Sequence, residues 1–200
     1  MGGVLVEVHR ERAIRNFKAI GLDDAEKFID PYQHKGLFFN FENGDVDTDE
    51  FCRLLCEYAG KLIPREAIEE AWRSIIDPPL DYKLNYLNDL RSKAYKVFLL
   101  SNNNPIIISW AFSHHFISSG RSLSDYFDKL YLSYRMKCIK PDLKIFRMMI
   151  DDAGIRPAES IYVDDGEKNI RAAADCGMSV LHVQNGADWR ADLTKLLHQL

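Results

Sequence analysis

Three short polar segments contain residue types that together can bind a phosphate group and a metal ion. Residues 101–104 are Ser-Asn-Asn-Asn, and their hydroxyl, amide and backbone N–H groups can hold phosphate oxygens. Residues 140–142 are Lys-Pro-Asp and offer a fixed positive charge ahead of a helix start, which can neutralise an anionic intermediate. Residues 164 and 165 are adjacent aspartates, and a hard cation such as Mg²⁺ prefers carboxylate ligands.

Each of these segments also has an ordinary structural interpretation. Turns strongly favour Ser, Asn and Asp, a Lys-Pro pair is commonly an exposed loop, and paired aspartates are commonly solvated or cap a helix. Their order and position favour a site, because each segment follows, at once or within a few residues, a short apolar run.

The apolar runs of the second half predict an α/β domain. They are too short for buried helices and rich in Val, Ile, Leu and Tyr, so we expect parallel strands at residues 97–100, 129–133, 161–163 and 180–183. Helices are expected between them at residues 105–116, 142–153 and 167–176. This alternation implies a doubly wound sheet with right-handed crossovers. Ligands bind beyond the carboxyl ends of such strands, which is where the polar segments lie.

The first half of the chain predicts helices without a convincing strand. We expect them at residues 10–20, 37–42, 48–62, 65–75 and 81–93. Asp47 or Thr48 can cap the third helix, and Pro64 precedes the fourth. The interpretation is therefore a core domain of residues 1–9 and 91–200, with residues 10–90 forming a helical cap.

Composition limits which classes of binding partner and which cellular location we expect. The 200 residues carry a net charge of −4 with Lys and Arg scattered along the chain, so we expect no nucleic-acid partner. No apolar run approaches a membrane span or a signal peptide, which predicts a cytoplasmic protein without membrane contact. Four cysteines without a CxxC pair are interpreted as reduced and structural: Cys52, Cys56, Cys138 and Cys176. The oligomeric state and the identity of the substrate stay open.

In order, the three polar segments resemble motifs II, III and IV of the haloacid dehalogenase superfamily. The resemblance covers residues 97–102, residues 140–142 with Ile145-Phe146, and residues 162–165 with Asn169 and Gly177. It is strongest toward the small sugar-phosphate phosphatases and the phosphatase-like domain of soluble epoxide hydrolases. Residues 2–6, Gly-Gly-Val-Leu-Val, resemble the part of motif I that follows the nucleophilic aspartate.

The resemblance implies a Rossmann-like, three-layer α/β fold with a parallel sheet, a helical cap inserted after motif I, and Mg²⁺ as cofactor. It implies catalytic roles for Lys140 and Ser101 and metal binding by Asp165 and Asp164. The substrate-binding set that it implies is Ser101, Asn102, Lys140, Gly2 and Gly3. The expected function is hydrolysis of a small phosphorylated metabolite, such as a sugar phosphate, through an aspartyl-phosphate.

The resemblance departs from the family pattern at the N-terminus. Met1 stands at the variable position that follows the nucleophilic aspartate in motif I. We therefore expect that aspartate and its strand to lie upstream of Met1, and the chain as written to be inactive. An internal Met taken as the start explains this more simply than an evolved loss. Without that central strand, a strand edge and apolar surface should be exposed.

Two other functions remain open at this stage. A chain that truly starts at Met1 is interpreted as a catalytically dead phosphate or metabolite binder. A metal-free haloacid dehalogenase would not need paired acids, so Asp164-Asp165 argues against it.

Other candidate sites are weaker. Asp45, Asp47 and Asp49 resemble a calcium loop, but Glu50 and Cys56 break the pattern. His114-His115 and the Cys52/Cys56 pair lack the further ligands of a zinc site. An aromatic and basic cluster in the cap either packs inside it or lines the substrate pocket: Tyr32, His34, Lys35, Phe38, Phe39 and Phe41.

Overall fold

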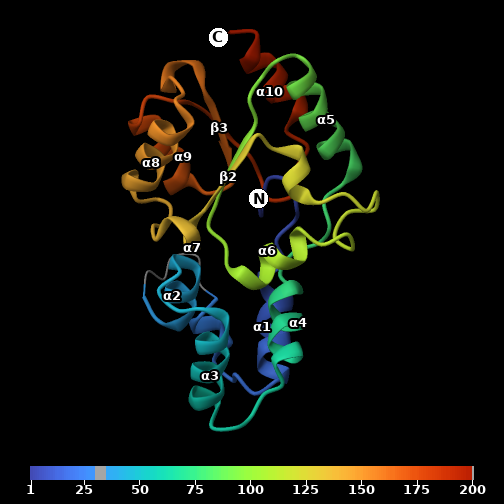
Figure 1. Cartoon of the computed structure of the whole chain (residues 1–200), viewed down its shortest axis with the longest axis vertical. Helices are drawn as coiled ribbons and strands as arrows, with labels where there is room; N and C mark the ends of the chain where they lie inside the picture. Colours follow the sequence, from blue (N-terminus) through green and yellow to red (C-terminus); the bar gives the residue numbers. More distant parts are fainter. Residues whose placement is uncertain (30–34, 200) are drawn as a thin grey trace.

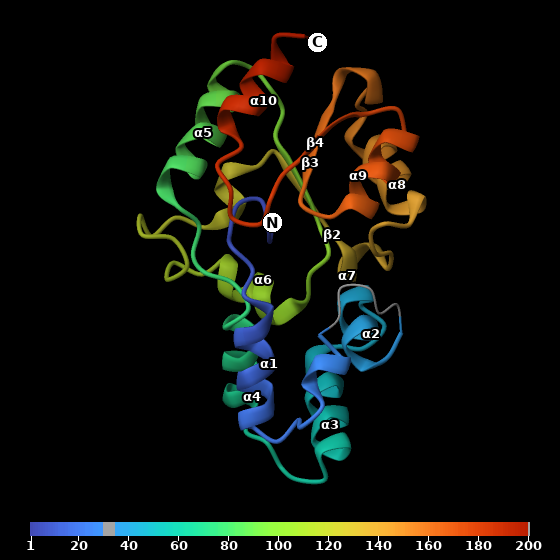
Figure 2. The same cartoon turned by 180° about the vertical axis from the view of Figure 1, so that it is seen from behind.

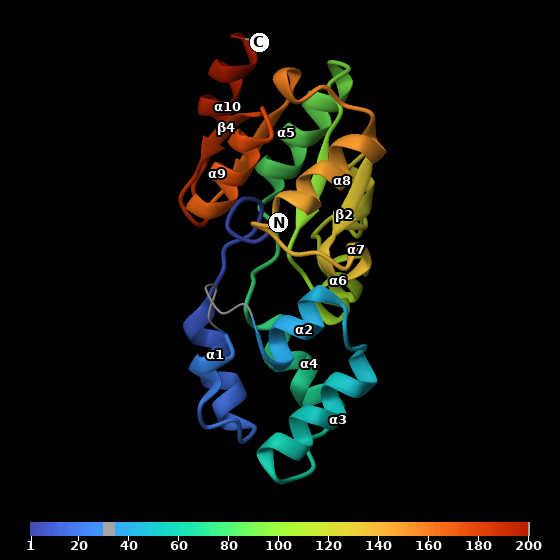
Figure 3. The ribbon, with the colours of Figure 1, turned by 90° about the vertical axis from the view of Figure 1, so that its left-hand side faces the viewer.

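The computed structural model describes residues 1–29 and 35–199, and it is elongated (Figure 1). Helices α1–α4 form one end and the strands with their flanking helices form the other. Figures 1 and 3 both show the N-terminus near the middle of the molecule, at the strand-containing end. None of the helices in the described ranges has the length and apolar character needed to span a bilayer.

The helical end contains α1 (Arg10–Ala19), the 3₁₀ turn η1 (Ala25–Lys27), α2 (Leu37–Asn43), α3 (Thr48–Ala59) and α4 (Arg65–Arg73). Asp47 caps α3 by accepting a hydrogen bond from the backbone N–H of Glu50 at 2.9 Å, and Gly60 ends it with φ of 66°. Large aromatic side chains fill its interior: Phe17, Phe38, Phe41, Phe51 and Trp72. These side chains belong to one hydrophobic cluster with residues of the strand-containing end such as Leu99 and Ile106.

Four short strands run parallel in pairs, which confirms the predicted parallel strands. They are β1 (Phe98–Ser101), β2 (Lys129–Leu132), β3 (Ile161–Asp164) and β4 (Ser179–His182). β1 pairs with β2 and β3 pairs with β4, giving two two-stranded sheets instead of the single expected sheet. No described residue forms a strand between β1 and β3.

A mostly apolar cavity of about 660 Å³ lies between the two strand pairs. Its walls include Leu99 of β1, Val163 of β3, and Met1. The facing edges of β1 and β3 are thus separated by a space whose lining matches the interior of a sheet. The sequence predicts an exposed strand edge and apolar surface for a core without its central strand, whereas the Leu99 and Leu100 side chains that line this space are buried.

Helices cover the strand pairs on both sides (Figure 2). α8 (Leu143–Ala153) and α9 (Glu167–Asp175) lie on one side, and α5 (Asp81–Ser92) and α10 (Arg190–Leu197) lie on the other. The remaining short elements are α6 (Pro105–Ala111), η2 (Leu123–Tyr126), α7 (Ser133–Met136) and η3 (Pro157–Glu159). α6 ends at Ala111, earlier than the predicted residue 116, so His114 and His115 lie in a turn after the helix.

Helix α5 packs with the strand-containing end, although its periodicity placed it in the cap. The Tyr86 hydroxyl is 2.7 Å from Thr194 Oγ1 of α10, and the Tyr86 and Trp189 rings meet edge to face at 5.6 Å. The division of the chain at residues 90 and 91 stays a prediction. The contacts of α5 favour a boundary before this helix, near residue 80, and such tertiary contacts cannot be recognised from the sequence of the helix alone.

Two linkers connect the helical end to the strands, and they run side by side. Val8 and Ile76 form an antiparallel bridge, and the His9 N–H donates to the Ile75 carbonyl at 2.6 Å. Asn185 fastens this ribbon to the strand-containing end by bonding both the N–H of Val8 at 2.9 Å and its carbonyl at 3.0 Å. The connection is therefore a paired backbone ribbon.

Candidate functional site

The polar segments meet at the carboxyl ends of β1 and β3. Ser101 is the last residue of β1 and Asp164 the last of β3, while Lys140 comes from the loop before α8. Lys140 Nζ lies 2.6 Å from Asp164 Oδ2, and both side chains are 7% exposed. The Met1 amino nitrogen lies 3.5 Å from Ser101 Oγ, which places the start of the chain at the same point.

Asp164 is surrounded by hydrogen-bond donors. Its Oδ2 accepts from Lys140 Nζ at 2.6 Å and from the Tyr162 hydroxyl at 2.6 Å. Its Oδ1 accepts from the Gly166 N–H and from Asn169 Nδ2, both at 2.8 Å. Burial by itself would raise the pKa of Asp164, but the Lys140 charge and these hydrogen bonds hold it well below its usual range.

Two opposing effects also act on the pKa of Lys140. Burial would lower its pKa, but Tyr162 and Asp164 raise it above the usual value, so the ammonium keeps its charge. Its position is set by Asn102, whose Oδ1 accepts from the Lys140 N–H at 2.8 Å and whose Nδ2 donates to the Lys140 carbonyl at 3.0 Å. The site therefore holds a buried ammonium that stays charged, on a backbone segment whose position Asn102 fixes.

Asp165 lies in a different environment from Asp164. Burial and the neighbouring Asp164 charge both raise its pKa, and in the described part of the chain it forms no ion pair. Gly3 lies directly against it, since a β-carbon at Gly3 would be 2.0 Å from Asp165 Cγ. A carboxylate that is repelled by its neighbour and forms no ion pair among the described residues fits Mg²⁺, which prefers oxygen ligands. Asp164, with four donors already bound, fits the role of anchor for Lys140 better.

The structure brings most of the predicted site residues together. Ser101, Lys140, Asp164, Asp165 and Gly3 gather at one point, as described above. The Asn102 side chain bonds the Lys140 backbone, and Gly2 lies against Val8, where a β-carbon would be 2.8 Å from Val8 Cγ2. The catalytic, substrate-binding and metal-binding roles assigned to these residues stay predictions.

Sequence reasoning missed two contributors. Tyr162 was noted only as part of the motif IV segment and its strand, with no role of its own, although its hydroxyl reaches Lys140 Nζ at 2.9 Å. The alternation of side chains along β3 places Tyr162 and Asp164 on one face, and this signal could have identified it. Ser133 was also missed: its Oγ accepts from the Asn103 N–H at 3.0 Å and donates to the Glu42 carbonyl at 2.6 Å, linking the site loop to α2.

The aromatic cluster of the cap divides between its two interpretations. Phe38 and Phe41 are buried in the helical end, where Phe41 stacks on Phe51 at 4.2 Å, so for them the packing interpretation holds. Lys35 is exposed and Phe39 is half-buried. Tyr32 and His34 lie outside the described residues.

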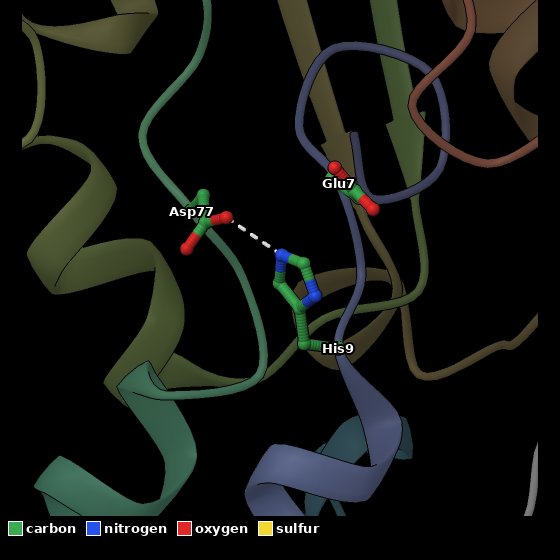
Figure 4. Close-up of side chains that lie close together, drawn as sticks. All are labelled: Glu7, His9 and Asp77. Carbon is green, nitrogen blue, oxygen red and sulfur yellow. Dashed lines mark hydrogen bonds and ion pairs between the residues drawn. The ribbon is translucent and has the colours of Figure 1, made fainter.

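A separate group of possible metal ligands lies on the linkers (Figure 4). The ligand atoms of Glu7, His9 and Asp77 all lie within 4.8 Å of one another. Asp77 is already shared, since His9 Nε2 lies 2.6 Å from its Oδ2 and an Arg12 nitrogen lies 2.7 Å from its Oδ1. We interpret this group as a polar brace between the two linkers.

Comparison with known proteins identifies relatives along nearly the whole chain. A model of the family described as haloacid dehalogenase-like hydrolase matches residues 3–177. The chain is 41% identical to D-ribitol-5-phosphate phosphatase of Bacteroides thetaiotaomicron over 197 residues, which cover 98% of this chain and 95% of that protein.

Two solved structures agree with this relationship. A predicted hydrolase of the same kind from Porphyromonas gingivalis superposes with a TM-score of 0.95 at 39% identity, covering 100% of this chain and 95% of that one. A family enzyme from Bacteroides thetaiotaomicron, solved in complex with magnesium and inorganic phosphate, superposes with a TM-score of 0.86 at 38% identity, covering 94% and 93%.

Proposed function

This chain belongs to the haloacid dehalogenase-like hydrolase family, and we propose that it is a Mg²⁺-dependent phosphatase of a small phosphorylated polyol or sugar. The observation that carries the proposal is the buried ion pair of Lys140 with Asp164 at the carboxyl ends of β1 and β3, beside Ser101 and Asp165. The similarity to a D-ribitol-5-phosphate phosphatase supports the substrate class.

In the proposed complex, the phosphate group lies between β1 and β3, where the Ser101 hydroxyl and the Lys140 ammonium donate to its oxygens. Asp165 provides the carboxylate for Mg²⁺, which when bound supplies positive charge that stabilises the phosphoryl oxygens. Lys140 keeps its charge throughout, because Asp164 and Tyr162 stabilise the ammonium. These residues lower the energy of the charged transition state by fixed electrostatics.

We propose that the attacking group is a carboxylate located immediately before Met1 in the enzyme's active form. A carboxylate oxygen there attacks phosphorus, the bond to the ester oxygen breaks, and the leaving alkoxide takes a proton from water to become the alcohol. Water then hydrolyses the aspartyl-phosphate to release inorganic phosphate and the carboxylate. The cavity between β1 and β3 is the space available for a strand that leads to this position.

The test extends the chain at its N-terminus with an apolar strand that ends in Asp directly before Met1. We expect this variant to release phosphate from D-ribitol 5-phosphate or a related compound in a Mg²⁺-dependent manner. The matched control carries Asn in place of that Asp, which keeps the strand and removes only the nucleophile. It should be equally stable and inactive.

Equal turnover by the unextended chain, purified free of contaminating phosphatases, would contradict the proposed mechanism. Phosphate binding without turnover in both extended forms would instead favour a non-catalytic binder.

A further inference from the structure

The Tyr162 hydroxyl forms hydrogen bonds with both members of the buried ion pair. Its oxygen lies 2.9 Å from Lys140 Nζ and 2.6 Å from Asp164 Oδ2, while the two charged atoms lie 2.6 Å from each other. All three residues are buried. The three atoms thus form a closed triangle inside the site.

The hydrogen-bonding capacity of this triangle is almost fully used. An ammonium has three N–H donors, of which Asp164 and Tyr162 each accept one. The single hydroxyl hydrogen of Tyr162 is donated to Asp164, and the remaining Asp164 oxygen accepts from Gly166 and Asn169. In the described ranges, one Lys140 N–H has no protein partner.

We propose that Tyr162 is a positioning residue, which takes up one Lys140 N–H and thereby directs the remaining N–H at the phosphate group of the substrate. The proposal rests on the phosphatase function proposed above. Without the hydroxyl, the ammonium would have a single buried acceptor and two donors free to rotate about it. The charge would remain, but its direction would no longer be set.

The ring of Tyr162 is held independently of its hydroxyl. It packs edge to face on Phe146 at a centroid distance of 5.2 Å and an interplanar angle of 77°. The Tyr162→Phe substitution therefore removes one oxygen and leaves the ring in its packing.

The chain supplies a matched control for this substitution. Tyr131 belongs to the same hydrophobic cluster as Tyr162, and its hydroxyl donates to Asp152 at 2.7 Å. Lys129 Nζ lies 2.5 Å from the same carboxylate. Tyr131→Phe therefore removes a phenol–carboxylate bond of similar length outside the site, from a trio in which the described residues show no hydrogen bond between the lysine and the phenol.

The experiment titrates the 200-residue chain and both variants with inorganic phosphate in Mg²⁺ and records the side-chain ammonium signal of Lys140 by ¹⁵N NMR. We expect Tyr162→Phe to weaken phosphate binding by about fivefold, as for the loss of one hydrogen bond's contribution, and to shift the Lys140 signal. Tyr131→Phe should change neither by a measurable factor. Both variants should melt cooperatively.

An unchanged Lys140 signal in Tyr162→Phe would overturn the proposal, as would an equal loss of affinity in Tyr131→Phe. A shifted Lys140 signal in a chain that binds no phosphate would sustain the positioning of the ammonium and contradict the phosphate position proposed beside Lys140, while the turnover of the Asp-extended chain tests the proposed function itself. The two failures are therefore distinguishable.

Discussion

Two trios of the same composition, a lysine, a tyrosine and an aspartate, contribute their tyrosine rings to one hydrophobic cluster. The inner trio is Lys140 with Tyr162 and Asp164, and its two charged side chains are each 7% exposed. The outer trio is Lys129, Tyr131 and Asp152, whose charged side chains are 50% and 52% exposed. The ion-pair distances are alike, 2.6 Å and 2.5 Å, but among the described residues a lysine–tyrosine hydrogen bond is present only in the inner trio.

The difference in burial changes what these contacts do. In the outer trio, hydrogen bonds from Lys129 and Tyr131 lower the pKa of Asp152, and water can replace either partner. In the inner trio burial opposes ionisation of Asp164, and the pKa is lowered only because partners replace the lost water. The same residue types therefore form a replaceable surface contact in one place and a permanent buried charge in the other.

The largest expected contrast is in turnover by the Asp-extended chain. Lys140→Met should lower kcat by about a thousandfold or more, because the charge that stabilises the transition state is lost. Lys129→Met should leave kcat within about twofold, since its charge lies outside the site. Phosphate release assays check both, and wild-type kcat in Lys140→Met would contradict the role of the buried charge.

The two aspartates should differ in their contribution to stability. Asp164→Ala leaves the Lys140 ammonium buried without its counter-ion and should lower the free energy of unfolding by about 3 kcal/mol. Asp152→Ala should lower it by less than about 1 kcal/mol. Urea denaturation of the unextended chain measures both values. Equal losses would mean that burial is not what separates the two trios.

A third carboxylate sharpens the comparison, because the Glu42 side chain is half-buried and the described residues give its carboxylate no hydrogen-bonding partner. Burial alone raises its pKa from 4.5 to about 7. Ionised Glu42 therefore costs stability, and the cost grows as pH rises from about 4.5 to about 7. Glu42→Gln should raise the free energy of unfolding by about 1–3 kcal/mol at pH 8. Denaturation at pH 4 is the control, where the difference should vanish.

The smallest expected effect is that of salt. Raising NaCl from about 0.1 M to about 1 M screens exposed charges much more than buried ones. The coupling between Lys129 and Asp152, measured by a double-mutant cycle, should fall by a few tenths of a kcal/mol. The coupling between Lys140 and Asp164 should stay constant. Equal salt sensitivity would indicate that water reaches the inner trio.

Local patterns determined the elements and the order of the site residues. The short apolar runs at residues 97–100 and 161–163, which directly precede Ser101 and Asp164, predicted parallel strands, because strand length and composition are local properties. The topology of parallel strands then placed Ser101, Lys140 and Asp164 at one edge, since their carboxyl ends point the same way. Asp47 and Gly60 likewise mark the ends of α3 in the sequence itself.

Tertiary structure decided the rest. The sequence carries no signal that α5 packs on α10 or that Asn102 bonds the Lys140 backbone. The motif segments single out Lys140 and Asp164 in the sequence, but they do not show that the two side chains are buried. Burial depends on which distant segments pack together, so only the folded chain shows that the Lys140 charge is held out of water.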